Sequence, residues 1–298
     1  MRQQVSLLPD RRRLHLQDGP IDLVIEAFGS SAEVNAAYDA AIRRFHTVLD
    51  ELCSELSLLR MPAGRDAPMP KGTIATRMAT AVAPYAERTF ITPMAAVAGA
   101  VAEEILEAMT SAAKLSKAYV NDGGDIALHL APGEQFVVGM IDRPDRPSLF
   151  GTAILGSSDP VRGIATSGWQ GRSFSLGIAD AVTVLAMRAA IADAAATLIA
   201  NAVDLPGHPR VHRVSARSIA PDSDLGDRPV TRFVGQLSAE DIMCALDQGA
   251  AVSEQLRSEG RIHSSALLLQ GETRVVTMNN LITSVADNRE RCRSLVHA

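Results

Sequence analysis

The feature that most constrains the fold is a run of short apolar segments between residues 118 and 166. The five segments are Ala118–Val120, Ile126–Leu130, Gln135–Ile141, Leu149–Leu155 and Gly163–Thr166. Their hydrophobic pattern alternates, and turns rich in Gly and Pro separate them. Strands joined by such short loops pair antiparallel, because a parallel connection needs a crossover of about a dozen residues or more. The sequence therefore predicts antiparallel sheet in the middle of the chain.

Helical and strand patterns also precede this run. Alternating residues around Asp18-Gly19-Pro20 predict a β-hairpin. Ser30 and Glu33 then have capping-box spacing, and apolar residues recur every three or four positions as far as Met61-Pro62, which predicts one long amphipathic helix. Thr92-Pro93 has the form of a helix start. The Ala and Gly residues that follow make the first turns slim, which fits either close packing or the approach of a ligand.

The second part of the chain repeats this mixture. A strand at Ala181–Ala186 leads into an alanine-rich helix, and residues 210–219 favour a strand. Ser238 and Gly260 mark the ends of a further helix, and Gln270-Gly271-Glu272 marks a second hairpin. Blocks of helices and antiparallel strands predict an α+β fold. We expect a single domain over residues 1–298, with halves of roughly 1–160 and 161–283 and a polar tail from 284 to 298.

The composition excludes a role in nucleic-acid binding. Hydrophobic residues make up 47% of the chain and charged residues 21%, which is typical of a globular protein. The formal net charge is −5. The only arginine run, Arg11-Arg12-Arg13, is interpreted as a solvated segment before the first strand. A nucleic-acid-binding protein would show a basic surplus or a basic stripe, so we expect no such partner.

Cysteine usage and the N-terminal segment indicate a location. The three cysteines lack metal-type spacing and fit a reducing compartment. The first residues, MRQQVSLLPDRRRLHL, lack the continuous apolar segment of a secretion signal, and no apolar run is long enough to span a membrane. We therefore expect a cytoplasmic protein without a membrane partner. We also expect a homodimer, because the alanine-rich apolar surface exceeds what one subunit can cover.

The stretch Asn121-Asp122-Gly123-Gly124-Asp125 is the first candidate site. Paired glycines let a backbone approach a ligand closely and can present N–H groups to an anion. Asn121 and Asp125 could bond a ribose or a ring edge. The alternative is a wide hairpin turn without a ligand.

A second candidate stretch carries polar groups after a predicted strand. Thr166, Ser167 and Gly168 offer hydroxyls and flexible backbone, and Arg172 and Ser173 could contact a phosphate. The only tryptophan, in the same stretch, has a possible stacking role, and the alternative is a solvated Ser/Gly loop.

Three polar residues follow in the next strand and helix. Asp180 stands where a strand begins. Asp193 and Thr197 are four residues apart, so they share one face of the alanine-rich helix. Oxygen ligands of this kind suit Mg²⁺, whereas the alternative is a surface Asp with a Thr that bonds back to the helix.

Taken in order, these stretches resemble the ApbE-like superfamily, whose best-known members are Mg²⁺-dependent FAD:protein FMN transferases. The matching segments are MAAVAGAVAEEIL, VNDGGDIAL, IATSG and AVTVLAMRAAIADAAAT, which cover roughly residues 90 to 202. The chain looks most like an uncharacterised bacterial and archaeal branch of that superfamily.

The resemblance implies an ApbE-like fold, with antiparallel sheets and packed helices in two similar intertwined halves around a central cleft. It implies that Asp193, Thr197 and the backbone near Val97 match the metal-binding groups. It also implies that residues 121–125 and 166–168 line the flavin or nucleotide site.

The chain departs from the transferases at two places. Ala98 stands where they carry a lysine, and the segment RSFSLGIAD replaces a His-Ile-x-Asp-Pro segment. The first hypothesis is therefore an Mg²⁺-dependent enzyme, a possible transferase, that acts on a phosphate-containing small molecule such as FAD or another nucleotide, with Asp180 as candidate general base. The second is a non-catalytic ligand-binding or interaction protein. The third is true FAD:protein FMN transferase activity.

Overall fold

The computed structural model describes residues 3–141, 149–277 and 282–284. The chain forms two compact units, each made of several segments. The first contains residues 1–135, 156–165 and 186–194, and the second contains residues 136–155, 166–185 and 195–298. The predicted division near residue 160 stays a prediction. The predicted tail from 284 lies outside the described residues, apart from Ser284.

An antiparallel sheet forms the centre of the first unit. The hairpin predicted around Gly19 is confirmed, with β3 pairing β2 on one side and β4 on the other. The outer strand β1, which the sequence analysis did not predict, pairs with β2 and is mostly exposed. The strands of this unit, in sheet order, are β1 (Gln3–Leu7), β2 (Leu14–Asp18), β3 (Ile21–Phe28), β4 (Lys117–Asp122), β5 (Asp125–Leu130) and β8 (Gly163–Ser167), the last of which continues into the second unit.

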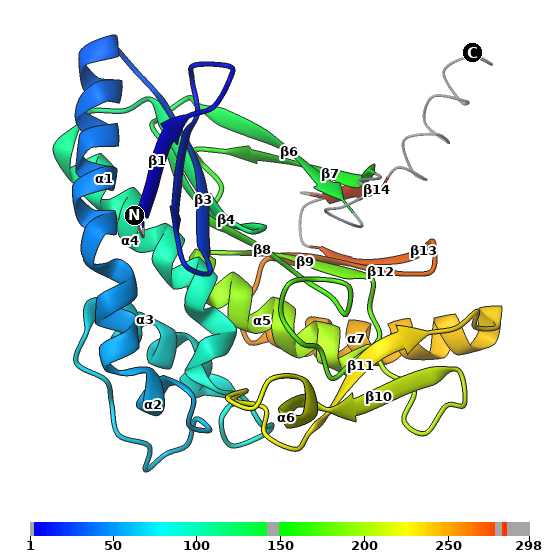
Figure 1. The fold of residues 1–298 in the computed structure, drawn as a ribbon. Helices are drawn as coiled ribbons and strands as arrows, with labels where there is room; N and C mark the ends of the chain where they lie inside the picture. The colour runs from blue at the N-terminus through cyan, green and yellow to red at the C-terminus, as the bar shows by residue number, and fades with distance from the viewer. Residues whose placement is uncertain (1–2, 142–148, 278–281, 285–298) are drawn as a thin grey trace, which may run out of the picture. The chain divides into compact units, whose positions relative to one another are not determined.

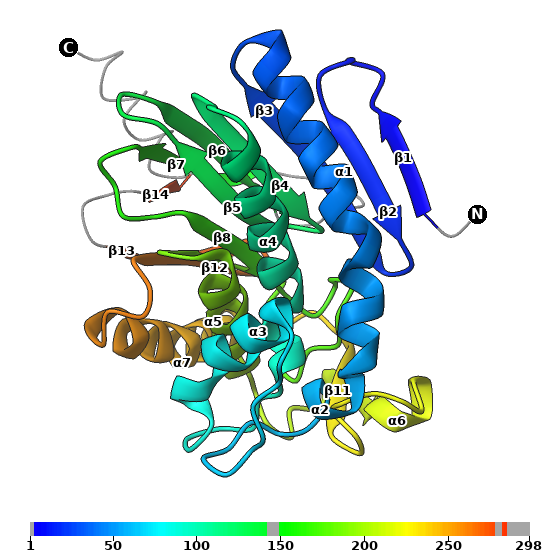
Figure 2. The ribbon, with the colours of Figure 1, turned by 90° about the vertical axis from the view of Figure 1, so that its left-hand side faces the viewer.

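Helices cover one face of this sheet. Figure 2 shows α1 in front of β2 and β3, and α4 in front of β4 and β5. The predicted long helix is divided into α1 and α2, separated by Glu55. The helices are α1 (Ser31–Ser54), α2 (Leu56–Leu59), α3 (Thr73–Val82) and α4 (Val97–Ala112), with short 3-10 turns at Ala83–Tyr85 and Pro93–Ala96.

Two predicted helix starts differ in detail from the structure. Ser30 accepts a hydrogen bond from the backbone of Glu33, as expected. The Glu33 carboxylate, however, accepts from the Lys114 backbone at 2.7 Å, so it ties α1 to the end of α4 instead of closing a capping box. Thr92-Pro93 opens a 3-10 turn, and Thr92 makes no side-chain cap. The α-helix itself begins only at Val97.

The second unit is built on two completely buried strands. β9 (Ala181–Ala186) pairs antiparallel with β12 (Ser264–Leu269), and every residue of both is buried. β13 (Glu272–Thr277) pairs with β12 across the predicted turn, and α7 (Ala239–Ser258) packs on both. α7 begins with a full capping box at Ser238, which confirms that prediction. α5 (Ala189–Ala202) starts in the first unit and ends in the second.

Two small sheets complete the second unit. β10 (Val211–Ser215) pairs with β11 (Pro229–Val234), and the short helix α6 (Ala216–Ile219) occupies the end of the segment predicted as one strand. The other sheet has the strand order β14-β7-β6. Its strands are β6 (Gln135–Ile141), β7 (Leu149–Gly156) and β14 (Ile282–Ser284). The described residues thus form an α+β fold of antiparallel sheets and packed helices, as predicted.

Candidate functional site

Asp193 caps the start of a neighbouring helix in the first unit. It lies on α5, and its Oδ2 accepts a hydrogen bond from the backbone nitrogen of Gly99 at 3.0 Å. The residue before α4, Ala96, has no side-chain oxygen to cap the helix. A carboxylate at this position accepts from an otherwise unpaired N–H group and is stabilised by the positive end of the helix dipole. Val97, the predicted source of a metal-contacting carbonyl, is the first residue of the same helix turn.

The surroundings of Asp193 disfavour its charge. Burial raises the pKa of the Asp193 carboxyl to about 7, against the lowering effect of the N–H groups of Gly99 and Ala98. The carboxylate of Asp122 raises that pKa further by charge repulsion. Asp122 is itself 6% exposed. The two carboxylates therefore repel each other beside a buried group, and a cation would relieve both effects.

The donor set limits which cation could bind. Among the described residues, no group of three or more His, Cys, Asp or Glu side chains could hold a metal ion. A cation at Asp193 would therefore complete its shell with hydroxyl, carbonyl, water or phosphate oxygens. Mg²⁺ binds in this way, through one or two carboxylates together with waters and substrate phosphates.

Thr197 follows Asp193 by one turn of α5. It is partly exposed and lies in the part of the helix that belongs to the second unit. The spacing of four residues places it on the same side of α5 as Asp193. Its predicted role as a metal ligand stays a prediction.

The Asn121–Asp125 stretch is a hairpin, as its alternative interpretation expected, but the turn is narrower than predicted. Asp122 ends β4, Asp125 begins β5, and the two pair directly. The turn itself is Gly123 and Gly124, with φ angles of 64° and 116° that side-chain-bearing residues rarely adopt. The Asn121 Oδ1 accepts from the Gly124 backbone at 2.8 Å. Gly123 is exposed at the tip of the hairpin, and the ligand role of this stretch stays a prediction.

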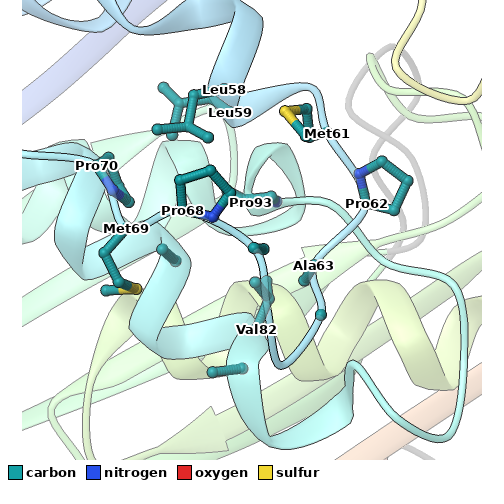
Figure 3. Close-up of a pocket in the computed structure, with 14 residues that line it drawn as sticks. Leu58, Leu59, Met61, Pro62, Ala63, Pro68, Met69, Pro70, Val82 and Pro93 are labelled. Carbon is teal, nitrogen blue, oxygen red and sulfur yellow. The ribbon is translucent and has the colours of Figure 1, made fainter.

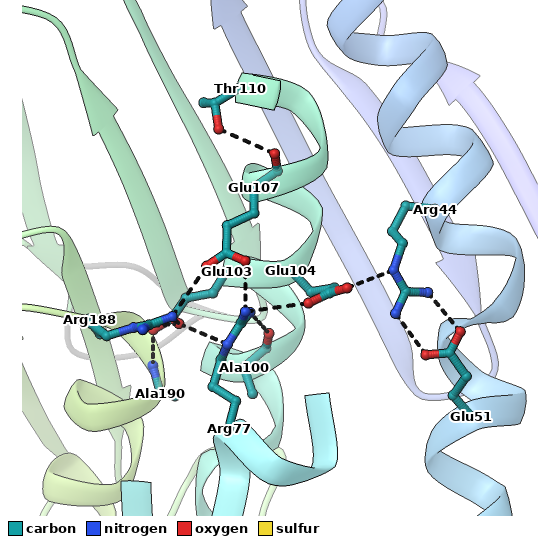
Figure 4. Close-up of polar contacts among 10 residues, drawn as sticks. All are labelled: Arg44, Glu51, Arg77, Ala100, Glu103, Glu104, Glu107, Thr110, Arg188 and Ala190. Carbon is teal, nitrogen blue, oxygen red and sulfur yellow. Dashed lines mark hydrogen bonds and ion pairs between the residues drawn. The ribbon is translucent and has the colours of Figure 1, made fainter. Parts of the chain in front are cut away.

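Glu103 on α4 caps α5 in return. Its Oε1 accepts from the backbone nitrogen of Ala190 at 2.9 Å, and its Oε2 accepts from Arg188 at 2.6 Å. The Nε of Arg77 lies 3.3 Å from the same oxygen. Glu103 is only 6% exposed, and Figure 4 shows it between the two guanidinium groups. The two helices therefore cap each other through one carboxylate each.

The ion pairs around Glu103 extend to two more helices, α3 and α1. Arg77 also contacts Glu104 at 3.4 Å and Glu107 at 2.8 Å. Arg44 joins Glu104 to Glu51, each at 2.7 Å. Figure 4 shows this chain of contacts from α1 through α4 to the start of α5. The network holds the two helix starts near Asp193 in place.

Gly99 permits the close approach of α4 and α5. A Cβ atom at this position would lie 2.4 Å from the carbonyl oxygen of Ala189. Such a contact can be relieved only by moving backbone, because the neighbouring atoms belong to the main chain. The slim helix start predicted from the sequence is thus explained by helix packing.

We expect Gly99→Ala to lower the free energy of unfolding by about 1–3 kcal/mol or more, because α5 must shift to make room. Urea unfolding followed by circular dichroism measures the change. Gly64→Ala is the matched control, since a Cβ there would meet nothing within 4 Å. Equal stability of the two variants would contradict the packing role of Gly99.

The predicted polar stretch after β8 packs against β9 in the second unit. Thr166 Oγ1 lies 2.9 Å from Thr183 Oγ1. A Cβ at Gly168 would lie 2.2 Å from the carbonyl oxygen of Asp180, so only glycine fits here. Further along, Arg172 and Ser173 are exposed. The ligand roles of Thr166, Ser167, Gly168, Arg172 and Ser173 stay predictions.

Asp180 holds three segments of the second unit together. Its Oδ1 accepts from the Trp169 indole nitrogen at 3.0 Å, and its Oδ2 accepts from the Gln270 backbone at 2.5 Å. Its own N–H donates to Leu268 at 2.9 Å. The indole N–H of Trp169 is thus used in this contact. A carboxylate oxygen can accept more than one hydrogen bond, so the base role of Asp180 stays a prediction.

The sequence analysis did not predict the contacts of Glu103 in the first unit or those of the Gln270 side chain in the second. Gln270 has a φ of 47°, and its side chain bonds Leu237 N at 3.1 Å and Gly235 O at 2.8 Å. The Gln-Gly pair at the predicted hairpin was a signal for the turn. Nothing local signals the long-range contacts of either residue.

An apolar pocket in the first unit contains none of the predicted site residues. Figure 3 shows it beside the loop that follows α2. Its volume is about 50 Å³, too small for a nucleotide. The residues that line it include Leu58, Leu59, Met61, Pro62, Met69, Pro70, Val82 and Pro93. In the described part of the chain, no helix is long and apolar enough to cross a membrane.

Solved structures give a weak overall similarity. The apo flavinyl transferase ApbE of Pseudomonas stutzeri is 12% identical, with a TM-score of 0.41 over 97% of this chain and 95% of that one. The flavin transferase ApbE of Vibrio cholerae is also 12% identical, with a TM-score of 0.39 over 93% of this chain and 99% of that one.

Sequence relatives give the stronger evidence. A UPF0280 protein of Methanopyrus kandleri is 36% identical over 60% of this chain and 69% of its own length. A UPF0280 protein of Methanothrix thermoacetophila is 38% identical over 37% of this chain, and the match covers 46% of its own length. The model of the family described as AbpE bacteria matches residues 5–275. The chain therefore belongs to this AbpE bacterial family.

Proposed function

We propose that this protein is a cytoplasmic, Mg²⁺-dependent protein that binds a phosphate-containing small molecule, either a flavin or another nucleotide. The observation that carries the proposal is the repulsion between the carboxylates of Asp122 and Asp193 in the first unit. Asp122 is buried, Asp193 is partly buried, and the pKa of Asp193 is raised. A bound cation would compensate this unfavourable charge.

The residues present suit a hard cation. Asp193 would provide the carboxylate, and by the resemblance Thr197 and the carbonyl of Val97 would add neutral oxygens. Mg²⁺ at this position would supply positive charge that neutralises a phosphate group. The start of α4, where Gly99 already donates to Asp193, also favours negative charge through its N–H groups.

The remaining predicted residues are candidates for ligand contacts, each within its own unit. Gly123 and Gly124 carry no side chains, so their backbone can approach a ligand at the hairpin tip, where the N–H of Gly124 already donates to Asn121. In the second unit, Arg172 would pair with a phosphate oxygen and Ser173 would bond it. Asp180 is the candidate base of transferase-type chemistry, held in its orientation by Trp169.

A non-catalytic binding protein is the second candidate. Ala98 replaces the lysine of the transferases, and both oxygens of Asp180 already accept hydrogen bonds. This arrangement favours binding without turnover. Transfer of FMN to a partner protein is the third candidate, and a covalent flavin on that partner would be its marker.

The test is calorimetric titration of the ligand-stripped protein with FAD, FMN and ATP, each with and without Mg²⁺. We expect one of these nucleotides to bind in an Mg²⁺-dependent manner. We expect Asp193→Asn to weaken this binding by more than about tenfold, because a metal ligand is lost. Turnover in the presence of Mg²⁺ would separate the enzyme from the binding protein.

Asp227→Asn is the matched control, because the Asp227 side chain is 73% exposed and forms an ion pair with the exposed Arg217 at 3.1 Å. It should bind like the wild type. Failure of all three nucleotides to bind the folded protein, or equal binding by Asp193→Asn, would overturn the proposal.

A further inference from the structure

The sheet β14-β7-β6 of the second unit has an exposed apolar surface beside its outer strand. Within the described residues, β6 is the outer strand of this sheet, and Figures 1 and 2 both show it next to β7. The exposed fraction is 66% for Val137 and 40% for Ile141 on β6, and 49% for Leu149 on β7. We call these three side chains the β6 patch.

The β6 patch is one continuous surface. Val137 and Ile141 are four residues apart on a strand, so they point to the same side, as does Gly139 between them. A Cβ at Gly139 would lie 2.9 Å from Cδ1 of Leu149. Leu149 therefore covers the glycine and fills the space between the two β6 side chains. A large apolar cluster on a strand is unlike the scattered single residues of ordinary surfaces.

The strand also lacks the usual protection of a sheet edge. Its sequence, QFVVGMI, contains no charged residue and no proline. Natural proteins place charges, prolines or bulges on outer strands to prevent pairing with another chain. A seven-residue strand of mostly apolar residues without them is suited to pairing.

We propose that a second copy of this chain covers the β6 patch, with β6 pairing antiparallel to β6 of that copy about a two-fold axis. An antiparallel strand is complementary to itself under such a rotation, so each copy supplies the partner for the other. The β6 patch carries no charge that would select a different partner. Its three side chains expose on the order of 200–300 Å² per copy, and the strand pairing adds to this toward the ~800 Å² per partner of a stable interface.

The homodimer expected from the sequence would be held together by this interface. It is independent of the proposed ligand, because it uses neither Mg²⁺ nor a nucleotide. Dimer formation and nucleotide binding can therefore fail separately.

The test is light scattering of the full chain at micromolar concentrations, with circular dichroism as a check of folding. Wild type should have twice the mass of one chain. Val137→Lys and Val137→Glu should each raise the dimer dissociation constant more than about 100-fold, because like charges meet across the axis. An equal mixture of the two variants should form the dimer again, since opposite charges then face each other.

Val214→Lys is the matched control, because Val214 is 41% exposed on β10, in a different sheet of the same unit. It should remain dimeric. A monomeric wild type, a folded Val137→Lys variant that stays dimeric, or an equal mixture that stays monomeric would each overturn the proposal.

Discussion

Glu103→Ala should lower the free energy of unfolding by about 3–5 kcal/mol, the effect of breaking a buried ion pair from one side. The carboxylate is 6% exposed and serves two guanidinium groups and one helix start at once. Its removal leaves Arg77, which is 12% exposed, without its most buried partner. It also leaves the N–H of Ala190 without its acceptor. Urea unfolding by circular dichroism measures the loss.

Glu107→Ala is the control for this prediction. Glu107 contacts the same two arginines, Arg77 at 2.8 Å and Arg188 at 3.2 Å, but its side chain is 56% exposed. Solvent screens such pairs, so its loss should change stability by less than about 1 kcal/mol. If Glu103→Ala and Glu107→Ala lost similar stability, burial would not determine the strength of these ion pairs, and the prediction would be wrong.

The importance of Glu103 could not be predicted from its own segment. In AVAEEILEAM it stands beside another glutamate on a helix, which is the pattern of a solvated face. Its burial depends on Arg188, which lies 85 residues further along the chain. Local periodicity indicates which face of a helix is apolar, but it does not reveal which charges tertiary contacts will enclose.

Short-range signals were more reliable. Ser238 caps α7, and the Gln270-Gly271 pair forms the turn between β12 and β13, because both features depend on residues within four positions. The tightness of the Asn121–Asp125 turn was not predicted, since five turn-forming residues allow several lengths. The direct pairing of Asp122 with Asp125 shows that the turn consists of Gly123 and Gly124.

The sequence placed Asp193 on the correct helix but could not show what it contacts. Gly99 is 94 residues away, and the hydrogen bond between them exists only because two glycine- and alanine-rich helix starts pack closely. Asp180 is similar, since its partner Gln270 is 90 residues away. The residue types indicated polar sites, whereas the partners came from the fold.

Asp193→Asn should stabilise the metal-free protein at pH 8 by on the order of 1–3 kcal/mol relative to wild type. The pKa of Asp193 is raised to about 7 in the folded protein, against about 4 for an ordinary Asp. The folded state therefore binds its proton more tightly than the unfolded state. The stability from this group is complete below pH 4 and is lost as the pH rises through about 7.

The advantage of Asp193→Asn should accordingly shrink between pH 8 and pH 5, where wild type regains its proton. Thermal unfolding of both proteins across this range, in a chelator, measures the difference. Added Mg²⁺ should reverse the order at pH 8, because a ligand that binds only the folded wild type raises its unfolding temperature and leaves the variant unchanged. A constant difference at every pH would contradict the raised pKa. A pH-dependent difference that Mg²⁺ does not change would support the raised pKa of Asp193 but contradict a bound cation. Asp193 would then act only as the cap of α4.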